Sequence, residues 1–162
     1  MGQNTYVIAL ALAGIALAQT DAEKEQYKVF SDLMDQTSYS WKPYTVETDD
    51  GWFLTTFRIS GASPPRDDLH PIFFQHGAEM DARNYAIGDS VPMSLVDRGY
   101  DVFLGNARGT MYSNVNVRAD TETLKEHWDF SWAEMGQYDI PAFVSKVIEV
   151  TEKPKITLIG FS

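Results

Sequence analysis

The sequence of 162 residues contains no cysteine, which excludes disulfide bonds, thiolate metal ligands and cysteine nucleophiles. Its three histidines, His70, His76 and His127, show no paired metal-ligand spacing, and the motif H-E-x-x-H is absent. The motif G-x-G-x-x-G is absent as well, because Gly105-Asn-Ala-Arg-Gly109 has its glycines at another spacing. We therefore expect neither a metal ion nor a cofactor.

Basic residues are scarce, and 13 Lys and Arg against 23 Asp and Glu give a net charge of −10. Nucleic acid and anionic membrane surfaces repel such a chain, so neither is an expected partner. No Asn-x-Ser/Thr sequon occurs, so glycosylation adds no support for secretion. In contrast, 44% hydrophobic and 13% aromatic residues supply a packed core, and the length suits one domain.

The N-terminus carries one uninterrupted apolar run, Val7–Leu17, which is followed by Ala18 and Gln19. Such a run is too short to span a bilayer as a helix, and with the A-x-A pattern of residues 16–18 it is typical of a secretory signal peptide. We therefore expect a signal peptide over residues 1–18 and a mature domain over residues 19–162. The first six residues lack Lys and Arg, and a buried N-terminal helix is the alternative.

The strand pattern is clear from residue 44 onward. Residues 20–40 are polar and weakly patterned, and we interpret them as an entry segment. The turn Asp49-Asp50-Gly51 separates two alternating segments, which predicts a β-hairpin. Five strands are predicted in all: Tyr44–Thr48, Trp52–Ile59, Pro71–Gln75, Tyr100–Leu104 and Lys155–Ile159.

Two helices are predicted between these strands. The first covers Ser90–Arg98, with Gly99 as its C-cap. The second follows a capping box at Ser131–Glu134, and it begins with Asp139 as N-cap and Pro141 in its first turn. Its apolar residues recur at helical spacing, at Ile140, Phe143, Val144, Val147 and Ile148.

This order of elements predicts an α/β fold in which an antiparallel N-terminal hairpin leads into a parallel sheet with helices on its faces. Ligands bind at the carboxyl ends of parallel strands. Three turns are expected at that edge: His76-Gly77, Gly105-Asn106 and Gly160-Phe161-Ser162.

Gly160-Phe161-Ser162 follows a short apolar strand, and it matches the first three positions of the G-x-S-x-G nucleophile elbow of α/β-hydrolases. As a bare tripeptide it would be an ordinary strand-end loop; its place after the fifth strand favours the elbow. A serine needs a base to become a nucleophile, and in that fold the acid and the histidine come later in the chain. We therefore expect the fold to be truncated after the fifth strand and this chain alone to be inactive.

His76-Gly77-Ala78 follows the third predicted strand, where α/β-hydrolases place a second oxyanion-hole donor. That donor is expected to be the backbone N–H of Ala78. His76 is interpreted as a hydrogen-bonded structural histidine. The acids of the pairs Asp49-Asp50 and Asp67-Asp68 are expected to be solvated. The aromatic residues of the region after His127 are expected to pack: Trp128, Phe130, Trp132 and Tyr138.

From about residue 40 onward the chain resembles the acid lipases, the lysosomal acid and gastric lipases within the α/β-hydrolases. The stretches that carry the resemblance are residues 44–54, His76-Gly77, 96–109, 128–142 and 159–162. The resemblance implies a sheet with a cap over the site, Ser162 as nucleophile, Ala78 as oxyanion amide, and residues 105–109 and 128–142 as structural support. Phe161 and Ala78 depart from the family, which usually has His and Leu there.

By this resemblance the intact protein hydrolyses lipid esters, triacylglycerols or steryl esters, in a secreted or lysosomal setting, with interfacial lipid contact through the cap. Two alternatives stay open. In the first, the chain is a non-catalytic truncated product, for example a remnant that binds lipid or a partner. In the second, the fold is the same but the enzyme cleaves another bond, as a thioesterase or a peptidase does.

Overall fold

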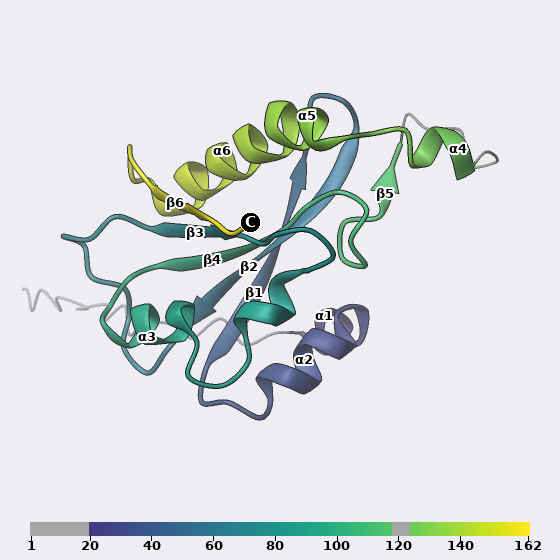
Figure 1. Cartoon of the computed structure of the whole chain (residues 1–162). Coiled ribbons are helices and arrows are strands. Elements are labelled where there is room, and N and C mark those ends of the chain that lie inside the picture. Colours follow the sequence, from purple (N-terminus) through teal and green to yellow (C-terminus); the bar gives the residue numbers. More distant parts are fainter. Residues whose placement is uncertain (1–19, 118–123) are drawn as a thin grey trace, which may run out of the picture.

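The computed structural model describes residues 20–117 and 124–162, and Figure 1 shows their arrangement. The predicted signal peptide at residues 1–18 lies outside the described residues. Among those that are described, no helix has the length and apolar character needed to cross a membrane.

One mixed sheet organises the chain, with helices on both of its faces (Figure 1). The strand order is β1-β2-β4-β3-β6, and the short β5 pairs with β2. The five predicted strands are all present, and β5 is an addition that the sequence did not indicate. The strands are β1 Ser40–Glu47, β2 Trp52–Ser60, β3 Ile72–Gln75, β4 Val102–Asn106, β5 Val115–Asn116 and β6 Thr157–Gly160.

Strand direction changes from antiparallel to parallel across the sheet, as predicted. β1 and β2 form the hairpin, and Gly51 in its turn has a φ of 92°, which favours glycine. β2 and β4 are antiparallel, whereas β3 pairs in parallel with both β4 and β6. The register sets Gln75 opposite Gly160, so the carboxyl ends of β3 and β6 lie side by side.

The entry segment, residues 20–40, contains two helices that the sequence did not indicate, α1 (Asp21–Gln26) and α2 (Lys28–Met34). Thr20 and Glu23 form a capping box at the start of α1. Phe30 is fully buried, and its ring stacks on Phe57 of β2 at 3.9 Å between centroids. Burying these apolar side chains on the sheet outweighs the weak helical pattern.

The first predicted helix is confirmed as α3 (Val91–Asp97), and Gly99 after it has a φ of 88°. A 3-10 turn (Ala82–Tyr85) precedes it, and α4 (Leu124–His127) follows β5.

The second predicted helix has a different start. The capping box at Ser131 is present, but α5 (Trp132–Glu134) continues through a π-turn (Met135–Asp139) into α6 (Ile140–Thr151). Asp139 therefore has helical backbone angles and caps nothing with its side chain. Its carboxylate bonds to Arg108 instead, which explains why the predicted N-cap role is wrong.

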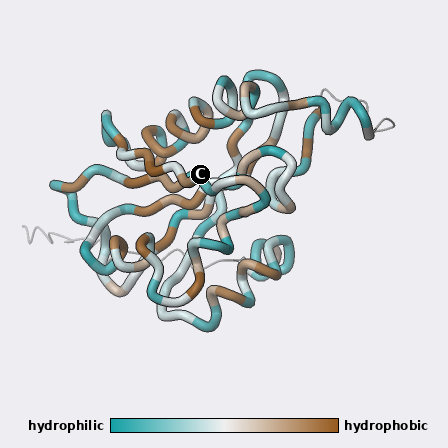
Figure 2. Tube along the Cα trace, in the orientation of Figure 1, coloured by the Kyte–Doolittle hydropathy of each residue, from teal (hydrophilic) through white to brown (hydrophobic). Residues whose placement is uncertain are grey.

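The core has two parts, one on each face of the sheet, because successive strand residues point to opposite sides. Phe74 packs with Phe30 and Phe57 on the face covered by α1, α2 and α3. Phe73 packs on the other face with Phe143 of α6, at 4.9 Å between ring centroids. Figure 2 shows the hydrophobic residues concentrated in the central strands.

Candidate active site

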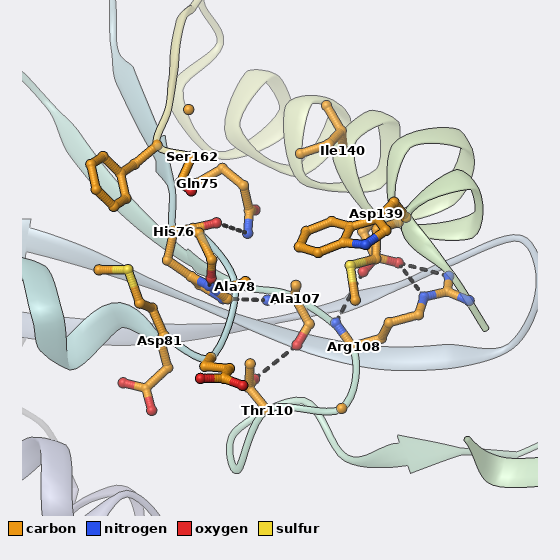
Figure 3. Close-up of a pocket in the computed structure, with 18 of the residues that line it drawn as sticks. Gln75, His76, Ala78, Asp81, Ala107, Arg108, Thr110, Asp139, Ile140 and Ser162 are labelled. Atoms are coloured by element: carbon orange, nitrogen blue, oxygen red, sulfur yellow. Dashed lines mark hydrogen bonds and ion pairs between the residues drawn. The ribbon is translucent and has the colours of Figure 1, made fainter. Parts of the chain in front are cut away.

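The carboxyl ends of β3, β4 and β6 open into one pocket of about 940 Å³. Its walls come from the turn after β3 (residues 75–81), the turn after β4 (107–111), the end of β6 (160–162) and the segment around α5 (128–140). Figure 3 shows Ser162, Gln75 and the His76–Ala78 turn together on one side of this pocket. The structure thus brings both predicted site residues, Ser162 and Ala78, to the same cavity.

Ser162 comes two residues after the end of β6. Its φ of 59° falls in the left-handed region, which costs a residue with a side chain about 1–2 kcal/mol. The N–H of Phe161 donates to the carbonyl of Gln75 at 3.0 Å and extends the β3–β6 pairing up to the residue before Ser162. The serine therefore projects from the sheet edge on a constrained backbone.

Gly77 permits this approach of the two turns. A Cβ atom at Gly77 would lie 2.8 Å from the carbonyl oxygen of Phe161 and 2.9 Å from the Cβ of Ser162. Both contacts are shorter than side chains tolerate, and the first involves backbone. Ala78, the next residue, is exposed in the pocket wall. Glu79 follows with a φ of 57°, so this turn is also in a strained backbone conformation.

His76 has the structural role expected from the sequence. Its Nδ1 donates to the carbonyl of Gly77 at 2.8 Å, and its Nε2 accepts the N–H of Ala107 at 3.0 Å. Burial lowers the pKa of His76, against the opposing effects of the Gly77 carbonyl and the charge of Asp81. A neutral ring thus ties the turn after β3 to the turn after β4.

Asn106, at the end of β4, is fully buried and bonded on both sides of its amide. Its Oδ1 accepts the N–H of Ala82 at 3.0 Å, and its Nδ2 donates to the carbonyl of Thr55 at 3.0 Å. Ser113 donates its hydroxyl to the carbonyl of Asn106 at 2.7 Å. The Asn106 side chain therefore ties the end of β4 to the backbone of two other segments, at Ala82 and at Thr55 of β2, and Ser113 of the following loop bonds back to Asn106.

Arg108 forms a buried ionic network that the sequence did not reveal. Its Nε donates to Asp139 at 2.8 Å, and its Nη1 and Nη2 donate to Asp50 at 2.6 and 2.9 Å. The Arg108 side chain is 1% exposed, and its guanidinium carbon lies 5.2 Å from the ring centroid of Trp52 and 5.8 Å from that of Tyr138. Asp50 is thus not a solvated turn acid as predicted, because it serves as the partner of a buried cation.

The network shifts the pKa values of its members. Burial alone would raise the pKa of Asp50, but hydrogen bonds from Arg108 and Thr48 outweigh it and the pKa lies below its ordinary value. Burial likewise opposes the charge of Arg108, yet its bonds to Asp50 and Asp139 raise its pKa. For Asp139 burial is the larger effect, and it raises the pKa against the hydrogen bonds and charge of Arg108. The network joins the β1–β2 turn, the turn after β4 and the π-turn.

Two of the aromatic residues expected to pack are instead open to the pocket. Trp128 and Trp132 are 50% and 66% exposed, and both line the cavity. Phe130 does pack, with its ring edge against Trp52 at 5.3 Å between centroids. Gly109 lets the turn after β4 lie against this layer, since a Cβ there would be 2.8 Å from Phe130 and 2.9 Å from Trp128.

The remaining histidines do not line the pocket. The Nε2 of His127 lies 2.7 Å from the Oδ1 of Asn114. Within residues 20–117 and 124–162, no group of three or more His, Asp or Glu side chains has an arrangement that could hold a metal ion.

Sequence comparison matches residues 30–89 to a family described as a partial alpha/beta-hydrolase lipase region. Lipase 1 of Drosophila melanogaster is 38% identical over 80% of this chain and 29% of its own length. The gastric triacylglycerol lipase of Rattus norvegicus is 33% identical over 82% of this chain and 35% of its own. The lipase lipl-1 of Caenorhabditis elegans is 32% identical over 98% of this chain and 41% of its own length. The chain thus spans well under half the length of these curated relatives.

Solved structures share the fold. A naproxen esterase from Bacillus subtilis superposes with a TM-score of 0.51 at 14% identity, over 90% of this chain and 42% of that one. A Pyrococcus furiosus esterase superposes with a TM-score of 0.50 at 20% identity, over 79% of this chain and 44% of that one. The sequence and structure matches confirm the expected acid lipase-like resemblance and the α/β-hydrolase fold.

Proposed function

Because the chain is acid lipase-like in sequence and carries an α/β-hydrolase sheet, we propose that the longer protein of which it is a part hydrolyses lipid esters. Ser162 is the nucleophile, and the backbone N–H of Ala78 is one donor of the oxyanion hole. The substrates are triacylglycerols or steryl esters. The observation that carries the proposal is the left-handed φ of Ser162, with its Cβ held close to Gly77 at the edge of the pocket.

The reaction is an acyl transfer in two steps. The Ser162 hydroxyl oxygen attacks the ester carbonyl carbon while a base takes its proton, and the resulting oxyanion accepts hydrogen bonds from backbone amides. The carbonyl re-forms as the alcohol leaves with a proton, and water then hydrolyses the acyl-enzyme. Losing one oxyanion donor typically costs about 10²–10³ in turnover.

The described residues supply no base for Ser162. Both ring nitrogens of His76 are engaged within the turns, and neither His70 nor His127 lines the pocket. The base and the acid that orients it are to come from the remainder of the longer protein. The 162-residue chain by itself is then inactive, since the members of a catalytic triad act as a unit.

A fluorophosphonate probe tests the nucleophile directly. In the full-length protein it is expected to label Ser162, and the variant Ser162→Ala is expected to lose both labelling and ester hydrolysis. Circular dichroism of the variant checks that it is folded. A folded full-length protein that hydrolyses esters without labelling at Ser162 would exclude this assignment.

The apolar run at residues 7–17 supports a further part of the proposal, that residues 1–18 direct the protein into the secretory pathway. N-terminal sequencing of the protein recovered from the medium or from lysosomes is expected to begin at Gln19. Recovery from the cytosol with residues 1–18 intact would contradict this part alone.

A further inference from the structure

The pocket has two chemically different sides. Figure 3 shows Ile140 and Asp139 on one side of the His76–Ala78 turn, and Asp81 on the other. The side toward α5 and α6 is lined by large apolar residues: Trp128, Phe130, Trp132, Met135 and Ile140. Asp139 on that side is turned to Arg108, so its charge is neutralised within the wall.

The opposite side is charged. Glu79, Asp81 and Arg83 all line it. The Asp81 carboxylate accepts the N–H of Arg83 at 2.8 Å and its Nε at 2.9 Å, which fixes the guanidinium at the pocket edge. An alkyl chain placed there would remove these polar groups from water without replacing their hydrogen bonds, which is unfavourable.

Gly136 is the gap in the apolar wall. It lines the pocket within the π-turn, and a Cβ atom added there would meet no other atom within 4 Å. Trp132, Met135 and Ile140 of the same helical segment bring long side chains to the cavity. The absence of a side chain at Gly136 therefore leaves open space along the apolar side.

The position of Gly136 is fixed from behind. Asp139 closes the π-turn, and its carboxylate accepts both the N–H of Arg108 at 3.0 Å and the Arg108 Nε at 2.8 Å. Isolated π-turns in helices are frequent at functional sites. The turn is thus anchored to the loop after β4.

We propose that the apolar side of the pocket, between Ser162 and the π-turn, takes the acyl chain of the ester, and that Gly136 determines how long a chain fits. This inference rests on the proposed function, and it adds the side of the pocket that takes the acyl chain and the residue that limits its length.

The test compares three variants of the full-length protein. Gly136→Leu places a branched side chain in the open space, and Gly136→Ala adds a single methyl group. Ala133→Leu is the matched control, because Ala133 is exposed on the same helical segment but does not line the pocket. Each variant is assayed for kcat/KM on p-nitrophenyl butyrate, octanoate and palmitate.

A methylene that is no longer buried costs about fourfold in kcat/KM. The leucine side chain of Gly136→Leu displaces several methylenes of a long acyl chain and none of a short one. The ratio of kcat/KM for palmitate to kcat/KM for butyrate is therefore expected to fall about tenfold or more. Gly136→Ala is expected to lower that ratio less than about threefold, and Ala133→Leu to leave it unchanged. An unchanged ratio in Gly136→Leu, or an equal fall in Ala133→Leu, would overturn the inference.

Labelling of Ser162 separates this inference from the proposed function. If Ser162 of the unsubstituted protein reacts with both short and long alkylphosphonates, the function stands and only the chain-length profile decides the role of Gly136. If the folded protein reacts with neither, the proposed function fails and the inference fails with it.

Discussion

The turns after β4 and after β6 lie at the same sheet edge, but they are held in very different ways. Asn106 at the end of β4 and Arg108 just after it are almost completely buried, and their side chains bond to several other segments. At the β6 end, Leu158 and Phe161 are 44% and 58% exposed, and backbone pairing to β3 is the main support. Among the residues described, the supporting wall of the pocket is therefore fixed by buried side chains, whereas the end of β6 is fixed by backbone pairing.

Removing the buried cation should affect the strongly fixed side most. Arg108→Met leaves Asp139 and Asp50 without their partner, and breaking one side of a buried ion pair costs about 3–5 kcal/mol. We expect the free energy of unfolding, measured with urea, to fall by about that amount. The exposed Arg66–Asp68 pair provides the control, because Arg66→Ala should leave the urea midpoint unchanged. An equal effect of both substitutions would mean that the network adds no specific stability.

A substitution at Gly77 tests the contact between the two turns. Gly77→Ala places a Cβ atom 2.8 Å from the Phe161 carbonyl oxygen, so the turn at Ser162 has to move. We expect a loss of about 1–3 kcal/mol in unfolding free energy, which is typical of overpacking. We also expect Ser162 of the full-length protein to be labelled more slowly by the fluorophosphonate probe. Gly136→Ala, where space is open, should lower neither. Normal labelling of Gly77→Ala would show that the close approach does not position the serine.

The smallest effect concerns pH and the ring that joins the turns after β3 and β4. Burial holds the pKa of His76 below its ordinary value of 6.5, so the folded ring stays neutral while the unfolded ring takes up a proton. Its contribution to stability is present above about pH 6.5 and declines as the pH falls toward the folded pKa. Urea unfolding between pH 7 and pH 5 should therefore show a decline that is shallower in His76→Gln. Equal slopes would assign the decline to other groups.

Sequence patterns predicted the sheet well because the strands carry their own signals. The hairpin turn at Gly51, the apolar run before His76 and the helix end at Gly99 depend on local backbone preferences, and all three are present. Helices α1 and α2 were missed although Thr20 and Glu23 form a recognisable capping box. Their helical conformation depends on packing Phe30 against β2, a contact between distant parts of the chain.

The site was less predictable, because its support comes from long-range pairs. Arg108 bonds to Asp139 and Asp50, which lie 31 and 58 positions away in the sequence, and no local pattern predicts either contact. Asp139 before a proline resembles a helix start, so the local preference pointed to the wrong role. Trp132 resembles a core residue by composition, and only the helix geometry around it decides that it opens to the pocket.

The π-turn also restricts how this segment can vary in length. It joins α5 to α6 as one continuous helical path, and α6 buries Phe143 and Val147 against the sheet. Adding or deleting one residue there would rotate everything that follows by about 100°, the angle between neighbours in a helix. Both side chains would then turn away from the sheet, so the spacing from Trp132 to Phe143 should tolerate changes of residue type far better than insertions or deletions.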